Sequence, residues 1–204
     1  MDQIATYIEV LQQTLDRLPN GLIAQVIDVL HRARIDGKQI FIMGNGGSAS
    51  TASHFVCDLA KNTRSDGMPH YRVIGLTDNM AIFSAYANDE GYENVFAKQL
   101  ANLINPEDIV IGISASGNSQ NVLNAIVEAK KYNATTIAFT GFDGGRLGQM
   151  VNINIHVESN IIEHVEDIHL MLEHMIVKVI KDQAQLKANI DTSITKLPAE
   201  VLGN

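Results

Sequence analysis

The chain has little of what would place it outside the ordinary globular proteins. Its 204 residues include one cysteine, four prolines and no tryptophan, and no apolar run approaches the roughly 20 residues that span a bilayer. The single cysteine, Cys57, excludes an internal disulfide, and residues 1–3 show neither the basic nor the apolar segment of a secretion signal. These absences predict a soluble protein of the cytoplasm. Cys57 is expected to be a small buried side chain rather than a nucleophile.

Positive charge is scarce as well. Lys and Arg number 15 against 23 Asp and Glu, which gives a formal net charge of −8 at pH 7. This sign argues against nucleic acid or membrane as a partner, so any bound anion must be held by a local site. Apolar residues make up 46% and charged residues 19% of the chain, ordinary usage that excludes wholesale disorder. The length suits one compact α/β domain with helical additions, or two small domains.

Apolar spacing predicts two helices before any strand. Apolar residues within 4–18 recur at three- and four-residue steps, the spacing of one helix face, until Pro19-Asn20-Gly21 breaks the pattern. A second helix is predicted over about 22–35, and Gly37 stands where a left-handed C-terminal cap is expected.

After residue 38 the pattern alternates between short apolar runs and helical stretches. The predicted strands cover residues 39–43, 72–76, 108–113, 135–140 and 151–157. A helix is predicted over about 49–61, and a final one over about 161–183, while the segment 185–204 has no sustained period and stays unassigned. This alternation predicts a parallel sheet covered on both faces, with ligands at the carboxyl ends of the strands.

The loop Gly44-Asn45-Gly46-Gly47-Ser48 follows the first predicted strand and opens a helix. Its glycines let the backbone approach a ligand closely, and the free N–H groups and dipole of the helix face an anion, so the loop suits one phosphate. It also fits the dinucleotide fingerprint G-x-G-x-x-A, but Asp78 comes late for the acid expected about 20 residues on, which ranks an NAD-type oxidoreductase last. A tight chain reversal without a ligand is the remaining alternative.

A second loop, after the third predicted strand, carries the hydroxyls of Ser114, Ser116 and Ser119. Hydroxyls donate to phosphate oxygens without adding charge. Neither loop contains Lys or Arg, so a sugar monophosphate is a better guess than a polyphosphate. The alternative is that these serines only cap a helix.

Acids and histidines gather on two predicted helices. His54 and Asp58 are four residues apart and share a helix face, so they could share an ion. The last helix holds a larger set: His164, Glu166, Asp167, His169, Glu173 and His174. Several pairs in that set share a face, and spacing alone does not choose among them. A solvated face with ion pairs between successive turns is the alternative.

Taken together, the motifs resemble the SIS (sugar isomerase) domain family, and within it they are most similar to bacterial phosphoheptose isomerases. The motifs are the glycine loop with His54-Phe55, the serine loop 112–119 and Thr140–Gly145. The resemblance implies a flavodoxin-like three-layer α/β sandwich with a five-stranded parallel sheet. Its implied boundaries are an N-terminal helical segment 1–37, the SIS domain 38–184 and the tail 185–204. It further implies an isomerase that converts sedoheptulose 7-phosphate into D-glycero-heptose 7-phosphate.

The resemblance also implies how the substrate is held. The serine loop would bind the phosphate, with Ala115 standing where the family often has a threonine. The implied substrate contacts as a set are Asn45, Gly46, Gly47, Ser48, Asp58, Asn88, Asp89, Ser114, Ala115, Ser116, Ser119 and Glu166.

For the metal, the resemblance implies zinc held by His54, Asp58, Glu166 and His174. Asp58 replaces a glutamate expected in the family and Glu166 replaces a glutamine, so the two carboxylates would formally neutralise a divalent ion. Asp58 is the implied carboxylate base and His174 the acid/base partner in proton transfer through an enediol. A tight ligand cannot be a free base at the same time, so one of the two is expected to loosen its metal contact during turnover.

Two alternatives stay open. Some members of the family are non-catalytic binding proteins associated with a replication initiator, and such a binder needs none of the four implied metal ligands. Another ketose phosphate is the second alternative, because Asp58, Ala115 and Glu166 depart from the family pattern. The relatives are homotetramers, so subunit packing through the first and last helices is expected.

Overall fold

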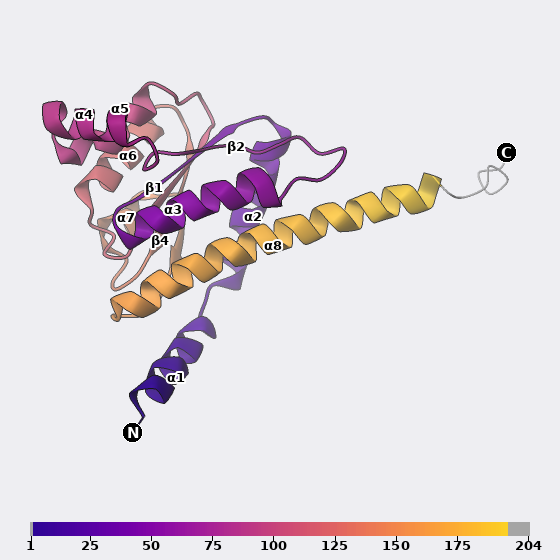
Figure 1. The fold of residues 1–204 in the computed structure, drawn as a ribbon, viewed down its shortest axis with the longest axis horizontal. Helices are drawn as coiled ribbons and strands as arrows, with labels where there is room; N and C mark the ends of the chain where they lie inside the picture. The colour runs from indigo at the N-terminus through magenta and orange to yellow at the C-terminus, as the bar shows by residue number, and fades with distance from the viewer. Residues whose placement is uncertain (1, 196–204) are drawn as a thin grey trace.

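A computed structural model describes residues 2–195 of the chain, and Figure 1 shows its architecture. Five parallel strands form one sheet in the order β2-β1-β3-β4-β5. Their bounds are β1 Gln39–Gly44, β2 Arg72–Gly75, β3 Ile109–Ser114, β4 Thr135–Thr140 and β5 Ile153–His156. The chain leaves β1 toward one side of the sheet and enters β3 on the other, so the loops after β1 and β3 flank a topological switch point where ligands bind in such sheets. The predicted parallel sheet is confirmed.

Helices cover both faces of the sheet. Their bounds are α1 Gln3–Leu15, α2 Asn20–Ile35, α3 Gly47–Cys57, α4 Met80–Glu90, α5 Val95–Ala101, α6 Gln120–Lys130, α7 Gly145–Met150 and α8 Ile162–Thr195, with a π-helical turn η1 Asp58–Asn62 and a 3₁₀ turn η2 Tyr92–Asn94. Successive strand residues face opposite layers: Ile40 and Ile42 pack with α2, α3 and α8, whereas Phe41 and Met43 pack with α5, α6 and α7. The result is the expected three-layer sandwich.

The first helix stands partly away from this sandwich (Figure 1). The Asp2 side chain caps it by accepting a hydrogen bond from the Ile4 backbone N–H. Tyr7 links α1 to the start of α8, because its hydroxyl donates to the Asp167 carboxylate at 2.6 Å. Ile4 and Ile8 nevertheless remain 70% and 57% exposed, so α1 presents an apolar face that the single chain does not cover.

The last helix is longer than the apolar pattern predicts. Residues 185–195 of the unassigned tail continue α8, and residues 196–204 lie outside the described part of the chain. Pairs of buried residues recur along α8 about every four positions from His164 to Ile180, which places one face of the helix on the sheet and on α3. Within residues 2–195, none of the helices is both long and apolar enough to cross a membrane.

Candidate active site

A pocket of about 280 Å³ opens at the switch point of the sheet. The loops after β1 and β3 and the start of α8 enclose it. Its lining consists of Asn45, Ser48, Ile113, Ser114, Ala115, Ser116, Ser119, Phe142, Ile162 and Glu166. The three serines implied for phosphate binding and most of the other implied contacts of the two loops therefore surround one small cavity.

The serine loop is fixed before any ligand arrives. The hydroxyls of Ser114 and Ser119 lie 3.1 Å apart and share a hydrogen bond, and the Ser116 hydroxyl accepts from the backbone N–H of Asn118. Gly117 has a left-handed φ of +62°, and its carbonyl accepts from the backbone N–H of Leu147 at 2.9 Å. Because this backbone is tied to α7, the hydroxyls can meet a phosphate without reorganising.

Asn45 is held by two residues that the sequence motifs do not include. Its side-chain amide pairs reciprocally with that of Asn121, at 2.9 and 2.8 Å, and the Tyr92 hydroxyl donates to Asn45 Oδ1 at 2.8 Å. Asn121 is 2% exposed. The signal for Asn121 in the sequence is a polar residue beside Val122, within an otherwise apolar helix face.

Glu166 lies in the phosphate pocket, against the N-terminus of α3. A Cβ atom added at Gly47 would stand 2.7 Å from either carboxylate oxygen of Glu166, so the absence of a side chain at Gly47 makes room for this acid. The helix N-terminus is electropositive and tolerates the carboxylate there. The resemblance implies Glu166 as a metal ligand, but the structure does not bring it into the histidine cluster described next.

A cluster of four ionisable side chains lies between α3, η1 and α8, which are in contact. Helices α3 and α8 run side by side in Figure 1. One ligand atom from each of His54, Asp58, Glu173 and His174 falls within 4.8 Å of all the others. Three of the four implied metal ligands are thus brought together. Glu173 takes the place in the cluster that the resemblance gives to Glu166.

The spacing of the cluster fits a small divalent cation. A tetrahedral site with bonds of about 2.0 Å separates its ligand atoms by roughly 3.3 Å. Nε2 of His54 lies 3.3 Å from Nε2 of His174, and Oε1 of Glu173 lies 3.5 and 3.2 Å from these two nitrogens. Oδ2 of Asp58 is 3.7 Å from Nε2 of His54. Imidazole and carboxylate are also donor types that zinc accepts.

Glu173 is fully buried, with a side-chain exposure of 0%. Burial, and after it the nearby Asp58 carboxylate, raise the pKa of Glu173 to about 8. Neither of its oxygens accepts a hydrogen bond from any residue in the described part of the chain. The sequence signal was an acid inside an apolar stripe, flanked by the buried Leu172 and Ile176.

Asp58 begins the π-helical turn, where a continuous α-helix is predicted. The Asn62 amide donates to Asp58 Oδ1 at 2.7 Å, and Oδ2 faces His54. The side chain is therefore oriented by one oxygen and keeps the other for the cluster.

Two of the implied substrate contacts lie away from the pocket. Asn88 and Asp89 are exposed on α4, in the layer opposite α8, and the Asn88 amide donates to the Asp89 carboxylate. They do not line the pocket of their own chain.

Cys57 is exposed, so the expectation of a buried cysteine is wrong. Cys57 lies on the face of α3 that points away from the sheet, whereas Phe55 points into the core.

The sequence profile of the SIS domain matches residues 5–141. The probable phosphoheptose isomerase of Thermoplasma acidophilum is 37% identical over 158 residues, which are 78% of this chain and 86% of the relative. The phosphoheptose isomerase of Aliarcobacter butzleri is 34% identical over 184 residues, covering 89% of this chain and 92% of the relative.

Solved structures show the same likeness. A phosphoheptose isomerase from Francisella tularensis superimposes with a TM-score of 0.82 at 33% identity, covering 89% of this chain and 97% of that one. A phosphoheptose isomerase from Neisseria gonorrhoeae gives a TM-score of 0.79 at 29% identity, with 88% and 95% covered. The chain therefore belongs to the SIS domain family and, within it, to the phosphoheptose isomerase family.

Proposed function

We propose that this chain isomerises sedoheptulose 7-phosphate to D-glycero-heptose 7-phosphate. The observation that carries the proposal is the placement of two sites on the same pair of helices. The N-terminal end of α3 borders the phosphate pocket, and its C-terminal end carries His54 toward the cluster with Asp58. On α8, Glu166 lines the pocket and His174 lies in the cluster.

The phosphate end of the substrate would lie among the hydroxyls of Ser114, Ser116 and Ser119. These groups, together with the N–H groups at the start of α3, supply hydrogen-bond donors where the described pocket lining offers no Lys or Arg side chain. This cradle of hydroxyl and backbone N–H donors, in which Glu166 is the one charged residue of the described lining, would grip one phosphate and leave the rest of the sugar to extend along α3.

The reacting end would lie at the cluster. Asp58 Oδ2 takes the proton from C1 of the ketose, and His174 Nε2 moves the proton between the two oxygens of the enediol. The carbon proton then returns to C2 to give the aldose. The cluster would hold a divalent cation, and that cation would supply Lewis acidity toward the carbonyl of the substrate. We propose zinc, because the donors of the cluster are imidazole and carboxylate.

The direct test is turnover in D₂O. The purified, zinc-loaded protein is incubated with sedoheptulose 7-phosphate, and products are followed by NMR. A new aldose phosphate with deuterium at C2 is the expected result, because the proton held on Asp58 exchanges with solvent. A protein with bound zinc that forms no aldose would refute the isomerase and favour the non-catalytic binder.

Two substitutions test the proton carriers. Asp58→Asn and His174→Ala are each expected to lower kcat roughly 10²- to 10⁴-fold, the usual contribution of a positioned acid or base. Binding of inorganic phosphate, measured by calorimetry, is expected to persist in both, because neither residue lines the phosphate pocket. Full turnover in both variants would reject these roles.

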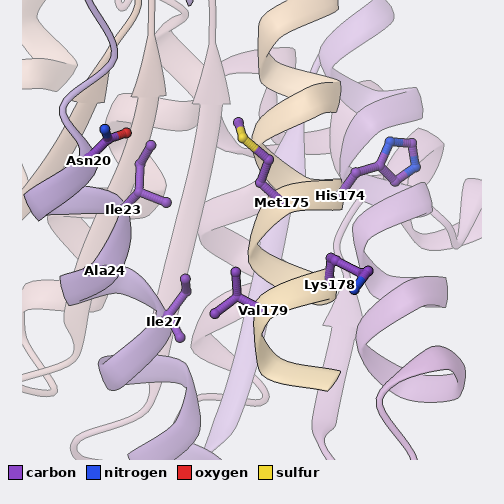
Figure 2. A pocket seen from close by; sticks show the side chains of 8 residues that line it. All are labelled: Asn20, Ile23, Ala24, Ile27, His174, Met175, Lys178 and Val179. Atoms are coloured by element: carbon purple, nitrogen blue, oxygen red, sulfur yellow. The ribbon is translucent and has the colours of Figure 1, made fainter. Parts of the chain in front are cut away.

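We also propose that the enzyme is a cytoplasmic homotetramer. An apolar groove of about 600 Å³ runs between α2 and α8, and Figure 2 shows Ile23 and Ile27 facing Met175 and Val179 across it. Together with the exposed apolar face of α1, this groove gives a second copy of the chain a surface to cover. The exposed Asn88 and Asp89 would then serve the pocket of a neighbouring copy.

The exposed thiol of Cys57 suits a reducing compartment such as the cytoplasm.

A further inference from the structure

Glu173 has a place in the structure that neither the sequence motifs nor the implied ligand set accounts for. A glutamate is rarely fully buried without a partner, since stripping its charge of water is costly. Glu173 is 0% exposed, and both of its oxygens lack a hydrogen-bond donor within residues 2–195. The groups that its carboxylate does face are the two imidazole nitrogens of the cluster.

Those three atoms form a nearly regular triangle. Its sides are 3.3 Å between the two histidine nitrogens, and 3.2 and 3.5 Å from Glu173 Oε1 to His174 and His54. One face of a tetrahedron around a zinc ion has sides of roughly 3.3 Å. An imidazole nitrogen that carries no proton cannot donate to the other two atoms of the triangle, whereas a cation bound by all three atoms would satisfy them together.

We propose that His54, Glu173 and His174 are the three protein ligands of the metal, and that Asp58 is not an obligatory ligand. Two histidines and one glutamate with one position left open form a donor set that catalytic zinc sites use. The part of Asp58 as the base rests on the proposed function, whereas the ligand role of Glu173 rests on the geometry alone.

This arrangement removes the conflict for Asp58, whereas His174, whose Nε2 is one of the three donors, would have to loosen its metal contact to carry the oxygen proton. If Asp58 had to hold the metal, it could not also carry a proton. With Glu173 as the third donor, Asp58 is free for proton transfer, and Asn62 fixes its other oxygen at 2.7 Å. Asp58 Oδ2 lies beside the donor triangle, 3.7 Å from His54 Nε2.

Glu166 provides the matched control. It lies on the same helix seven residues earlier and carries the same functional group, but its carboxylate contacts the start of α3 and lines the phosphate pocket. The substitutions Glu173→Gln and Glu166→Gln make the same isosteric change in the two places. Only the first is expected to alter metal binding.

The experiment measures zinc affinity of the full chain by competition with a chromophoric chelator, after the metal has been stripped. Glu173→Gln is expected to lower the affinity at least about 100-fold, the upper end of what is lost even when a group behind a ligand is removed. Glu166→Gln is expected to keep the affinity of the unsubstituted chain. Asp58→Asn is expected to lose far less affinity than Glu173→Gln while it loses turnover.

Thermal melts of the metal-free proteins, run in parallel, distinguish the loss of a metal ligand from a folding defect in Glu173→Gln. The metal-free variant is expected to melt no lower than the unsubstituted chain, since no hydrogen bond is lost. Zinc is expected to raise the melting temperature of the unsubstituted chain and of Glu166→Gln, but not that of Glu173→Gln. Cobalt bound in place of zinc is expected to change its visible spectrum only in Glu173→Gln.

The proposal is overturned if Glu173→Gln binds zinc as tightly as the unsubstituted chain, if Glu166→Gln is the variant that loses zinc, or if the unsubstituted chain binds none. Failure of the proposed function looks different. A chain that shows the expected zinc affinities but no turnover of sedoheptulose 7-phosphate would refute the isomerase and leave the ligand assignment of Glu173 standing.

Discussion

Two glutamates on one helix carry the same group into opposite surroundings. Glu166 faces a polar, partly open pocket, whereas Glu173 is enclosed between α3 and α8 among apolar neighbours. The raised pKa of Glu173 is the electrostatic cost of that enclosure. Such a cost is commonly retained where the group binds a cation, because a bound cation reverses the preference for the neutral acid.

His169 is a second buried ionisable residue on α8, and it makes stability depend on pH. Burial lowers its pKa to about 4, although the hydrogen bond with the Thr140 carbonyl opposes the shift. The folded state therefore holds a neutral imidazole where the unfolded chain binds a proton below about pH 6.5. The contribution of His169 to stability is complete above that pH and declines by up to about 3 kcal/mol as pH falls toward 4.

The measurement is urea unfolding of metal-free protein at several pH values between 4 and 7. His169→Gln keeps an amide donor for Thr140 and is expected to flatten the fall in unfolding free energy toward acid pH. His70→Gln, at an exposed position, is the control and is expected to keep the full slope. The raised pKa of Glu173 adds a pH dependence of the opposite sign, but that contribution is common to all three proteins. Equal slopes in all three would contradict the role of His169.

At this scale, the sequence predicts only those residues whose spacing is informative. His54 and Asp58, four apart on one helix, lie together as predicted. The choice between Glu166 and Glu173 could not be made from spacing, because both lie within reach of His169 or His174 on neighbouring turns. It depends on how α8 is rotated against α3, which tertiary packing sets.

Among the elements, the contact between the serine loop and the loop before α7 is the tightest constraint on the phosphate pocket. A Cβ atom at Gly117 would overlap the backbone carbonyl of Gly144, and φ at Gly117 is +62°. Gly117→Ala is therefore expected to cost at least about 2 kcal/mol of unfolding free energy, from backbone strain and from the displaced loop. It is also expected to weaken the binding of inorganic phosphate.

Gly21→Ala is the control for that substitution. Gly21 lies in α2 with no atom within 4 Å of the added Cβ and without a left-handed φ. Alanine is expected to stabilise the protein there by about 0.5 kcal/mol, because it restricts the unfolded chain and favours helix. Denaturant unfolding compares the two variants, and an unchanged stability in Gly117→Ala would show that the two loops can separate.

Element types were predictable wherever an apolar period was long. The strand at 135–140 has its predicted bounds, and the helix over 49–61 is present with a two-residue earlier start. The π-helical turn at Asp58 and the short helix α7 were not predicted. A single wide turn leaves no periodic trace, and α7 has only six residues, of which two are glycine.

For the whole molecule, the proposed assembly predicts that the groove between α2 and α8 is covered in solution. Val179 lines this groove and is 38% exposed in the single chain. Val179→Asp is expected to reduce the mass measured by light scattering from that of a tetramer to smaller species, since burying an unpaired carboxylate in an apolar contact is costly. Val127→Asp makes the same change on α6, in the opposite layer, where valine is 49% exposed.

The control is expected to keep the mass of the unsubstituted protein. A tetramer that survives Val179→Asp would place the subunit contact elsewhere. The sequence indicated that the first and last helices were available for packing. The groove itself forms only because the fold brings residues 155 positions apart, such as Ala24 and Val179, to line the same space.

The run of α3 from the phosphate pocket to the cluster also bears on which sugars react. Gly47 and His54 are seven residues apart, or about 10 Å along the axis at 1.5 Å per residue. An extended chain advances about 1.2 Å per bond, so the eight bonds from C1 to phosphorus in a heptulose 7-phosphate cover about the same length. A pentulose phosphate falls about 2.4 Å short, and kcat/KM is expected to rise steeply from five to seven carbons. Equal kcat/KM values for the two sugars would contradict this expectation. A steep rise would mean that the length of α3 between the pocket and the cluster selects the length of the carbon chain that reacts.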